Sequence, residues 1–340
     1  MRECGKVIVV TTINRPTLPM RRLAEKRDDW DIVVVADKKT PPDWHLDGCR
    51  LLTVDQQDAM FKNLSTAIPY NHYSRKMLGY AHAIRSGATL IAETDDDNEP
   101  LAGWPSSDEV VFGRLIRSAD RWLNPYEYFS DEETLWPRGF PLQLIRGQSR
   151  SECLGQEERR AAIQQWLANG DPDVDAIYRL IVGKVDHKFS GEPLLLTPGT
   201  VSPFNSQCTT WLPEAFPLLY LPSTVSFRMT DIVRSFVAQA CLAAVGGTLA
   251  YHGPGVFQDR NEHNLLRDFA DEVSGYLNNA RIVSELFRLP LASDSCSIYS
   301  NLQVCYEMLV DLGVCEPREL PMLEQWATAT RQSLPSGAPE

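Results

Sequence analysis

Near-continuous runs of apolar residues open the chain and indicate a parallel sheet. Residues 6–12, K-V-I-V-V-T-T, and residues 31–37, D-I-V-V-V-A-D, are rich in β-branched side chains. A short segment of helical character, around P-M-R-R-L-A-E-K-R, separates them. Strands that are apolar on both faces and joined by a helix are typical of βαβ units in parallel sheets. The run L-L-T-V at 51–54 predicts a third strand.

The next helix and strand are predicted directly before an acidic turn. Asn71 is a good N-cap, and the helix would run through Ser86 to a stop at Gly87. The strand A-T-L-I-A-E-T at 88–94 then leads into three consecutive aspartates at 95–97. In open α/β sheets, ligands bind at the carboxyl ends of the strands. The acidic turn therefore lies at the predicted ligand-binding edge.

The remainder of the chain divides into a loop-rich middle and a helical end. Residues 100–225 are rich in proline and tryptophan and lack clear periodicity, which favours long loops over a few short elements. Thr230 is predicted to cap an apolar helix, and T-L-A-Y-H at 248–252 predicts another strand. We expect an α/β domain at 1–262 and a helical C-terminal extension at 263–340 that packs on it. The amphipathic helices of that extension could cap the domain or form a homo-oligomer surface.

The composition is that of a globular protein and narrows the classes of partner. The 340 residues are 43% hydrophobic and 23% charged, with a formal net charge of −12. Neither a nucleic-acid backbone nor an anionic membrane is attracted to so acidic a chain. No apolar run approaches the ~20 residues of a membrane helix or resembles a secretory signal. The eight cysteines form no C-x-x-C pair, so we expect free thiols in a cytoplasmic protein.

The acidic turn is the strongest candidate for chemistry. Adjacent carboxylates repel one another where water is partly excluded, unless a cation or a hydrogen-bonding partner offsets the charge. Asp95 and Asp97 could share a Mg²⁺ or Mn²⁺ ion, which prefers oxygen ligands and leaves positions open for a substrate diphosphate. The alternative is a solvated acidic turn or a helix N-cap. The buried strand that precedes the turn favours the metal site.

Two further segments reach the same predicted edge of the sheet. The ends of the first two strands carry side chains that could contact a base or ribose, namely Thr11, Thr12, Asn14, Arg15 and Asp37. Arg75 and Lys76 lie early in the next predicted helix, where N-terminal amides also attract an anion. In the alternative interpretation both side chains face solvent. Neither G-x-G-x-x-G nor G-x-x-x-x-G-K is present, which removes the usual dinucleotide and P-loop classes.

Polar residues beside later apolar segments are candidates for acid–base chemistry. Asp231 lies in the first turn of its predicted helix, where it could act as a base or only stabilise the helix dipole. The string D-P-D-V-D adds Asp173 and Asp175. His252 and His263 could ligate a metal or serve as buried hydrogen-bonding groups, and the structural role is favoured for a lone histidine.

Several strings taken together resemble a known family. They include P-Y-N-H-Y-S-R-K-M-L-G-Y, E-T-D-D-D-N-E, L-W-P-R-G-F-P-L, D-P-D-V-D-A-I-Y-R-L, P-F-N-S-Q and L-P-S-T-V-S-F-R-M-T-D-I. From about residue 6 to 275 the chain resembles the glycosyltransferase-like domain of STELLO proteins. More distantly, the order of D-D-D, R-G-F-P and P-D-V-D resembles the reversibly glycosylated polypeptides, the UDP-arabinopyranose mutases.

The resemblance implies an α/β fold of glycosyltransferase-A type, a Rossmann-like mixed sheet flanked by helices. It implies a nucleotide-diphosphate donor, expected to be a UDP-sugar, and Mn²⁺ or Mg²⁺ held by Asp95 and Asp97. The expected nucleotide pocket joins the ends of the first two strands to Arg75, Lys76, Asp95 and Asp96. Asp231, then Asp173 and Asp175, are candidates to orient or deprotonate an acceptor hydroxyl. The candidates for contact with the acceptor or the sugar are Arg138, Arg228, His252 and His263.

Other classes of protein stay open besides a transferase. They are a mutase or self-glycosylating protein, a non-catalytic nucleotide-sugar-binding module, and a nucleotidyltransferase. The mutases glycosylate an arginine in a string like S-L-R-E-G, whereas this chain reads Q-L-I-R-G and displaces Arg146 by one position. Their paired acids in a later helix are reduced here to Asp231 in M-T-D. Both differences favour a transferase, and the glycine-rich basic loop of a nucleotidyltransferase is not found.

Overall fold

The structure is a computed structural model, which describes residues 5–132, 134–147, 150–183, 186–259 and 264–331. The strands of these residues are β1 (Lys6–Thr12), β2 (Asp31–Ala36), β3 (Cys49–Leu52), β4 (Leu90–Asp95), β5 (Asn98–Pro100), β6 (Val110–Ser118), β7 (Ser151–Gly170), β8 (Leu194–Leu196), β9 (Cys208–Trp211) and β10 (Thr248–Gln258). They form one mixed sheet in the order β3-β2-β1-β4-β9-β7-β6-β8-β10-β5, and β7 also pairs with β10.

The first half of the sheet is parallel and brings the predicted strand ends to one edge. Strands β3, β2, β1 and β4 are parallel neighbours, and β9 then pairs antiparallel with β4. In this register Thr12 pairs with Ala36, and Thr11 pairs with Asp95. The side chains of β1 alternate between two buried layers, because both faces of these strands are covered. The acidic turn therefore lies beside the end of β1, as predicted.

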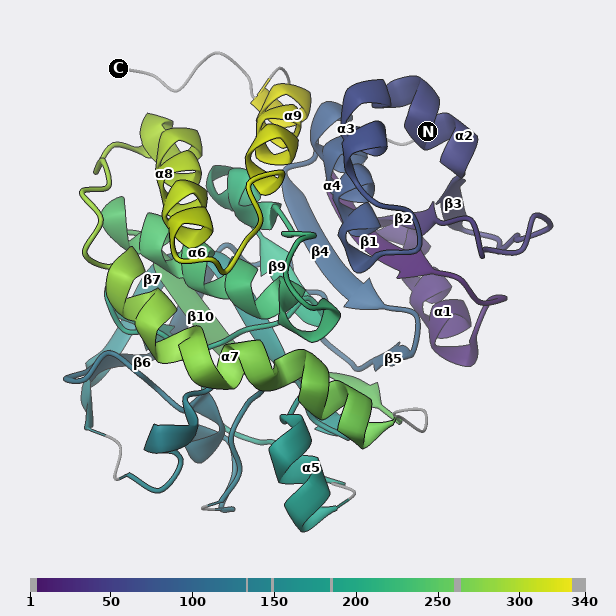
Figure 1. Ribbon diagram of the computed structural model, residues 1–340. Helices are drawn as coiled ribbons and strands as arrows, with labels where there is room; N and C mark the ends of the chain where they lie inside the picture. Colours follow the sequence, from purple (N-terminus) through teal and green to yellow (C-terminus); the bar gives the residue numbers. More distant parts are fainter. Residues whose placement is uncertain (1–4, 133, 148–149, 184–185, 260–263, 332–340) are drawn as a thin grey trace.

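Helices cover both faces of the sheet (Figure 1). They are α1 (Leu18–Leu23), α2 (Val54–Met60), α3 (Lys62–Ala67), α4 (Lys76–Arg85), α5 (Ala176–Val182), α6 (Thr230–Ala244), α7 (Leu265–Leu286), α8 (Ile298–Asp311) and α9 (Glu319–Arg331). Helix α4 packs directly on the sheet at Gly79, where a Cβ atom would lie 2.5 Å from side-chain atoms of Val9 and Val35. Any larger residue at this position would push α4 away from the strands that carry the edge.

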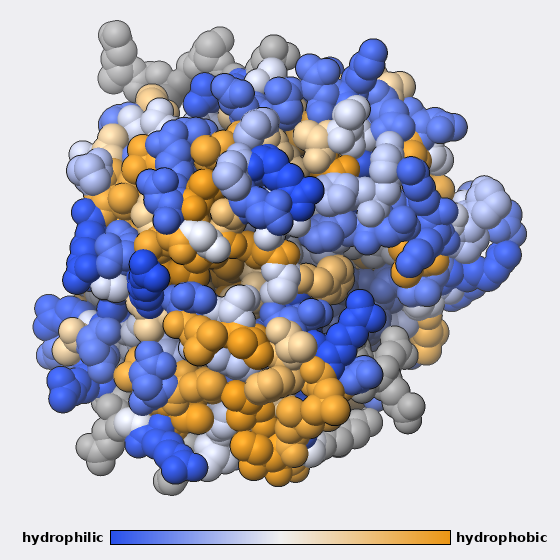
Figure 2. All heavy atoms as spheres, in the orientation of Figure 1, coloured by the Kyte–Doolittle hydropathy of each residue, from blue (hydrophilic) through white to orange (hydrophobic). Residues whose placement is uncertain are grey.

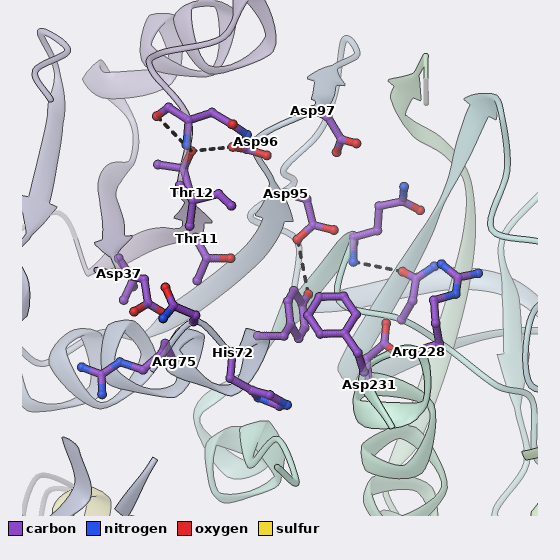
Figure 3. A pocket seen from close by; sticks show the side chains of 18 of the residues that line it. Thr11, Thr12, Asp37, His72, Arg75, Asp95, Asp96, Asp97, Arg228 and Asp231 are labelled. Carbon is purple, nitrogen blue, oxygen red and sulfur yellow. Dashed lines mark hydrogen bonds between the residues drawn. The ribbon is translucent and has the colours of Figure 1, made fainter. Parts of the chain in front are cut away.

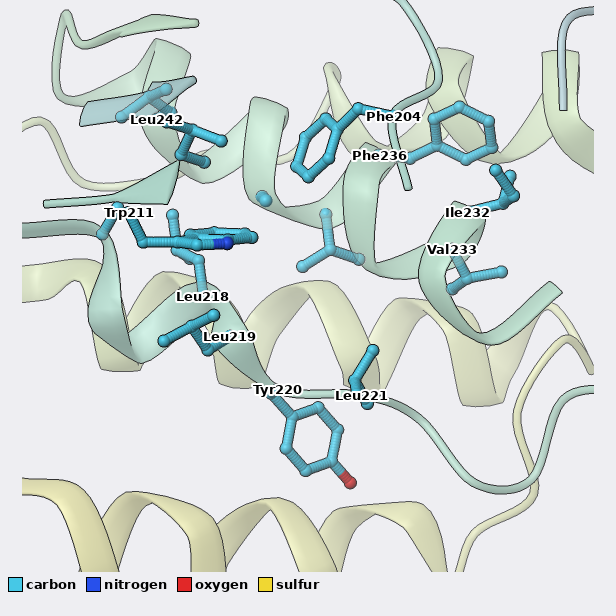
Figure 4. Close-up of a cluster of buried hydrophobic side chains, with 14 of the residues drawn as sticks. Phe204, Trp211, Leu218, Leu219, Tyr220, Leu221, Ile232, Val233, Phe236 and Leu242 are labelled. Carbon is cyan, nitrogen blue, oxygen red and sulfur yellow. The ribbon is translucent and has the colours of Figure 1, made fainter. Parts of the chain in front are cut away.

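The C-terminal helices share a core with the sheet domain. Helix α8 packs on α6, and α9 packs on α3 and α4. Figure 4 shows the buried side chains of α6 lying among those of the segment from Trp211 to Leu221. The predicted mixed α/β sheet flanked by helices, with a helical C-terminal extension, is confirmed. The division at residues 262 and 263 stays a prediction.

Two broader expectations can be compared with the described residues. Within the described ranges, no helix is long and apolar enough to cross a membrane. The seven cysteines in the described part of the chain are free thiols, as predicted. Two of them, Cys241 on α6 and Cys305 on α8, lie with their sulfur atoms 3.8 Å apart inside the shared core.

The predicted start of the helix from Asn71 to Ser86, which corresponds to α4, is wrong. Asn71 does not cap it, because its backbone has a φ of 54° and an N-cap needs an extended conformation. His72 instead accepts a hydrogen bond from the backbone N–H of Ser74 and caps a 3-10 turn, Tyr73–Arg75. Helix α4 begins only at Lys76, so the predicted anion site at an Asn71-capped helix end is not formed.

Two other predicted boundaries are displaced. Thr230 is the first residue of α6 and not its cap, because Met229 occupies the N-cap position without a side-chain hydrogen bond. The third strand ends before the predicted run at 51–54 does, since Thr53 starts the next helix. Thr53 and Gln56 form a reciprocal capping box at the start of α2, and this local pairing takes those residues out of the strand.

The middle of the chain contains more strand than predicted. Strand β7 is 20 residues long, and β6 pairs antiparallel with it from Val110↔Arg160 to Ser118↔Ser151. Half of the first ten residues of β7, S-E-C-L-G-Q-E-E-R-R, are charged, and most of the ten are exposed. Pairing with β6 holds this half of β7 in the sheet, and no hydrophobic pattern in β7 itself predicts that pairing.

Exposed apolar side chains gather on α5 and the start of α7. Leu180, Ile181 and Val182 on α5 and Leu266 and Phe269 on α7 are all exposed, and the two helices pack together. Figure 2 shows apolar surface in the region where these helices lie in Figure 1. None of the five residues lines the pocket described below, so this surface is separate from the candidate site.

A buried ion pair joins β4 to α6. Both guanidinium Nη atoms of Arg234 donate to the carboxylate of Glu93, at 2.8 and 3.0 Å, and both side chains are buried. Tyr80 and Trp211 donate the other hydrogen bonds to Glu93. Glu93 stands two residues before Asp95 in the sequence, and Arg234 stands three residues after Asp231. The pair therefore fixes the acidic turn relative to the start of α6.

We predict that Arg234→Ala lowers the free energy of unfolding by about 3 to 5 kcal/mol, because it leaves the carboxylate of Glu93 buried without its cation. Urea unfolding measures the change. Arg318→Ala is the matched control, since Arg318 pairs with Glu316 on the surface and its loss should cost at most about 0.5 kcal/mol. Equal, small losses in both variants would contradict the assigned role of Arg234.

Candidate functional site

A pocket of about 360 Å³ lies at the carboxyl edge of the parallel strands. Its lining includes twelve of the residues predicted from sequence, namely Thr11, Thr12, Asn14, Asp37, Arg75, Asp95, Asp96, Asp97, Arg138, Asp173, Arg228 and Asp231. Figure 3 shows Thr11 and Asp37 on one side, the acidic turn in the middle, and Arg228 and Asp231 on the other side. The volume suits a small-molecule ligand.

Lys76 lies beneath the acidic turn and forms a buried ion pair with its first aspartate, Asp95. Its ammonium Nζ lies 2.9 Å from Oδ1 of Asp95, and it also donates to the carbonyl oxygens of Thr94, at 2.7 Å, and Ser206, at 3.1 Å. The side chain is fully buried, so the solvent-facing alternative is wrong for Lys76. The ammonium supports the turn from behind and does not line the pocket.

The two outer aspartates of the turn face the pocket. Burial raises the pKa of Asp95 to about 6, and the Lys76 ammonium opposes this effect while the neighbouring Asp97 adds to it. Asp97 accepts a hydrogen bond from Nε2 of Gln258, at 3.2 Å. Figure 3 shows the side chains of Asp95 and Asp97 extending from the same turn. Carboxylate oxygens are the ligands that a hard cation prefers, so Asp95 and Asp97 are the residues of this turn that could hold one.

The central aspartate of the turn has a different set of partners. Oδ2 of Asp96 accepts hydrogen bonds from Oγ1 of Thr12 and from Nδ2 of Asn14, the latter at 3.1 Å. Its carbonyl oxygen accepts from Oγ1 of Thr17. Asp96 therefore ties the acidic turn to the loop after β1, and all three aspartates line the pocket.

The far wall of the pocket carries a buried cluster of one arginine and two aspartates. Nη2 of Arg138 lies 2.8 Å from Asp173 and 2.9 Å from Asp231, and its Nη1 also donates to Asp231 at 2.9 Å. Nδ2 of Asn205 donates to Asp173 at 2.9 Å. Because one planar guanidinium holds both carboxylates, the orientation of Asp231 is fixed by its neighbours.

The two remaining arginines of the pocket, Arg75 and Arg228, form hydrogen bonds with neighbouring structural elements. Arg75 is buried and donates to the carbonyl oxygen of Ser65, at 3.0 Å, and to the side chain of Gln57, so it also does not face solvent. Arg228 donates to Glu272 of α7 at 2.8 Å. These contacts join α2, α3 and α7 to the site and make both arginines parts of its walls.

Among the described residues, three predicted residues lie outside the pocket lining, besides Lys76. Arg15 is exposed and pairs with Asp43. Asp175 is the N-cap of α5. His252 is buried, stacks on Trp166 with ring centroids 4.2 Å apart, and has its pKa lowered to about 4 by burial. His263 lies outside the described residues.

The arginine that a mutase would modify is also placed away from the pocket. Arg146 is exposed and follows the 3-10 turn Leu142–Leu144, and it is not among the lining residues. No observation on the described residues therefore favours the mutase interpretation.

Sequence reasoning missed several residues of the pocket wall. They include Ile13, His72, Tyr73, Asn205, Gln207, Phe227 and Gln258. Phe227 lies inside a string that was recognised, L-P-S-T-V-S-F-R-M-T-D-I, but an isolated apolar side chain carries no chemical signal. Tyr73 could have been found, because it precedes Arg75 and Lys76 by a few residues, and its hydroxyl contacts Asp95 at 3.3 Å.

Fold and site together define a class of protein. A mixed α/β sheet whose parallel strands end at an acidic turn, with a pocket between that turn and a later helix, is the glycosyltransferase-A type predicted from sequence. A family model described as STELLO glycosyltransferases matches residues 228–317, which include Arg228, Asp231 and helices α6 to α8.

Two relatives from Arabidopsis thaliana are similar along nearly the whole chain. "Probable glycosyltransferase STELLO2" is 30% identical over 332 residues, which cover 91% of this chain and 41% of the relative. "Probable glycosyltransferase STELLO1" is 28% identical over 348 residues, which cover 95% of this chain and 44% of the relative. The chain thus spans less than half the length of these relatives. The predicted resemblance to STELLO proteins is confirmed.

We predict that Asp175 makes stability depend on pH. Burial raises its pKa from 3.8 to about 6, although Tyr178 N–H and Trp136 Nε1–H donate to the carboxylate. Because the pKa of Asp175 is higher in the folded state, its contribution to stability is fully present below about pH 4 and is lost as pH rises through 6. Relative to Asp175→Asn, the wild type should lose up to about 3 kcal/mol between pH 4 and pH 7 in urea unfolding. A difference that grows in the opposite direction would refute this role.

Proposed function

We propose that this chain is a metal-dependent glycosyltransferase that moves a sugar from a UDP-sugar to an acceptor. The observation that carries the proposal is the pair of carboxylates, Asp95 and Asp97, held over the buried Lys76 ammonium at the edge of a parallel sheet. Strand ends with hydrogen-bonding side chains adjoin the pair on one side, and the Arg138 cluster adjoins it on the other. The names of the two relatives support the same class.

The residues of the acidic turn fit a divalent cation. Among the described residues, no three His, Cys, Asp or Glu side chains are grouped as a complete metal cage. Mg²⁺ is usually held by one or two carboxylates together with water and substrate phosphates, so two aspartates are sufficient. Asp95 and Asp97 would hold Mn²⁺ or Mg²⁺ only when the donor supplies the remaining oxygens. When bound, the cation would offset negative charge on the departing diphosphate.

One side of the pocket would bind the nucleoside of the donor, and the other side would align the acceptor. Thr11, Asn14 and Asp37 lie at the ends of β1 and β2, where they would bind the nucleoside. Lys76 holds Asp95 in place and offsets part of the charge of the turn. Asp231, oriented by Arg138, would accept a hydrogen bond from the acceptor hydroxyl and align it for attack on the sugar.

We predict that Asp97→Ala weakens UDP binding in the presence of Mn²⁺ at least tenfold, because one of two protein ligands is lost. Calorimetric titration with and without the metal measures it, and UDP release from UDP-sugars should fall in parallel. Asp43→Ala is the matched control, since Asp43 is an exposed aspartate outside the pocket that pairs with Arg15. Metal-dependent binding that survives Asp97→Ala would rule out the proposed mechanism.

We predict a separate effect for Asp231→Asn. The variant keeps the shape of the side chain but loses the carboxylate, so the transfer rate should fall about 100-fold while UDP affinity stays within about twofold. Coupled detection of UDP release gives the rate. Asp311→Asn, on the distant helix α8, should retain full activity. An Asp231→Asn variant with unchanged turnover would exclude Asp231 from acceptor activation.

A further inference from the structure

An exposed aromatic ring stands in the wall of the pocket. Phe227 is 56% exposed, although a phenylalanine side chain is normally buried, and it lines the pocket. It lies in the 3-10 turn Phe227–Met229 that leads directly into α6. Its position is not explained by packing of the core.

Two neighbouring rings fix the orientation of Phe227. Its ring centroid lies 5.8 Å from that of Tyr73 and 6.1 Å from that of His72, with interplanar angles of 69° and 76°. Tyr73 is itself anchored through hydroxyl contacts with Ser206 and Asp95. Edge-to-face contacts of this kind hold a ring without covering it. Phe227 is therefore a rigid apolar surface that is presented to a ligand.

The surroundings of Phe227 are polar. Asp231 follows four residues later in the sequence and also lines the pocket, and so do Arg138 and Asn205. A flat apolar ring beside carboxylate, guanidinium and amide groups suits a ligand that has both apolar faces and many hydroxyl groups. A sugar ring has this character: its C–H groups carry partial positive charge and contact the negative face of an aromatic ring, while its hydroxyls bond to polar neighbours.

The position of Phe227 favours the acceptor over the donor nucleotide as the ligand that contacts its ring. Figure 3 shows Asp95 between the side with Thr11 and Asp37 and the side with Arg228 and Asp231. Phe227 immediately precedes Arg228 and leads into the helix of Asp231, and its ring packs against Tyr73, whose hydroxyl contacts Asp95 in the middle of the pocket. A lipid chain is a poor occupant of this side, because the Arg138 cluster would lose its hydration without gaining hydrogen bonds.

We propose that Phe227 is the stacking platform of a saccharide subsite, and hence that the acceptor is a sugar or glycan. This inference rests on the proposed function, because it names the acceptor class of the same pocket. It assigns to Phe227 the apolar face of the acceptor ring, and to Asp231 one of its hydroxyls.

Saturation-transfer NMR on the full chain with UDP and Mg²⁺ tests the subsite. The probes are methyl glycosides of glucose, galactose, mannose, xylose and arabinose, their β-linked disaccharides, and a short peptide that contains serine and threonine. We expect transfer to sugar C–H protons in the wild type, at least tenfold weaker affinity in Phe227→Ala, and binding restored in Phe227→Trp. Phe269→Ala, an exposed phenylalanine on α7 outside the pocket, is the matched control and should bind as the wild type does.

Calorimetric binding of UDP in the same variants separates this inference from the proposed function. Unchanged UDP affinity in Phe227→Ala, together with lost sugar binding, supports the subsite. Three results would overturn it: sugar binding that is unaffected by Phe227→Ala, no saturation transfer to any saccharide, or saturation transfer to the peptide alone. A wild-type chain that binds saccharides through Phe227 but binds no UDP would retain the subsite and refute the glycosyltransferase.

Discussion

Repulsion between carboxylates at the end of β4 is the constraint on which the site depends. Three consecutive aspartates stand where a buried strand reaches the surface, and the groups that offset their negative charge differ from one aspartate to the next. The Lys76 ammonium lies under Asp95, and hydrogen bonds from the loop after β1 hold Asp96. The pKa of Asp95 is still raised, so the ammonium does not cancel the effect of burial and of Asp97. A divalent cation that binds together with a diphosphate would offset the remaining negative charge of the aspartates.

A second requirement is that distant parts of the chain hold the two walls of the pocket at a fixed separation. Glu93 and Arg234 join β4 to α6, so their ion pair holds the acidic turn close to the start of the helix that carries Asp231. Glu272 of α7 binds Arg228 and also accepts the backbone N–H of Ala176 at the start of α5. The C-terminal helices thus contribute to the geometry of the acceptor side, although they supply few residues that line the pocket.

The parts that could be predicted from sequence are those with a local signal. Strands β1, β2 and β4 are apolar on both faces, and the acidic turn follows one of them directly, so their shared edge could be inferred from chain order. The charged half of β7 could not be predicted, because its partner β6 ends more than 30 residues earlier. Lys76 and Arg75 were recognised as cations, but their directions are set by Thr94, Ser206 and Ser65, which no local pattern identifies. The cluster of Arg138 with Asp173 and Asp231 likewise joins segments 35 and 93 residues apart.

Anomalous diffraction from crystals grown with UDP and Mn²⁺ tests the central claim most directly, because it locates the cation independently of the protein atoms. The account predicts a manganese peak in contact with the carboxylates of Asp95 and Asp97 and with the diphosphate of UDP. Bound UDP without a manganese peak at these carboxylates, or a diphosphate held elsewhere in the molecule, would contradict it.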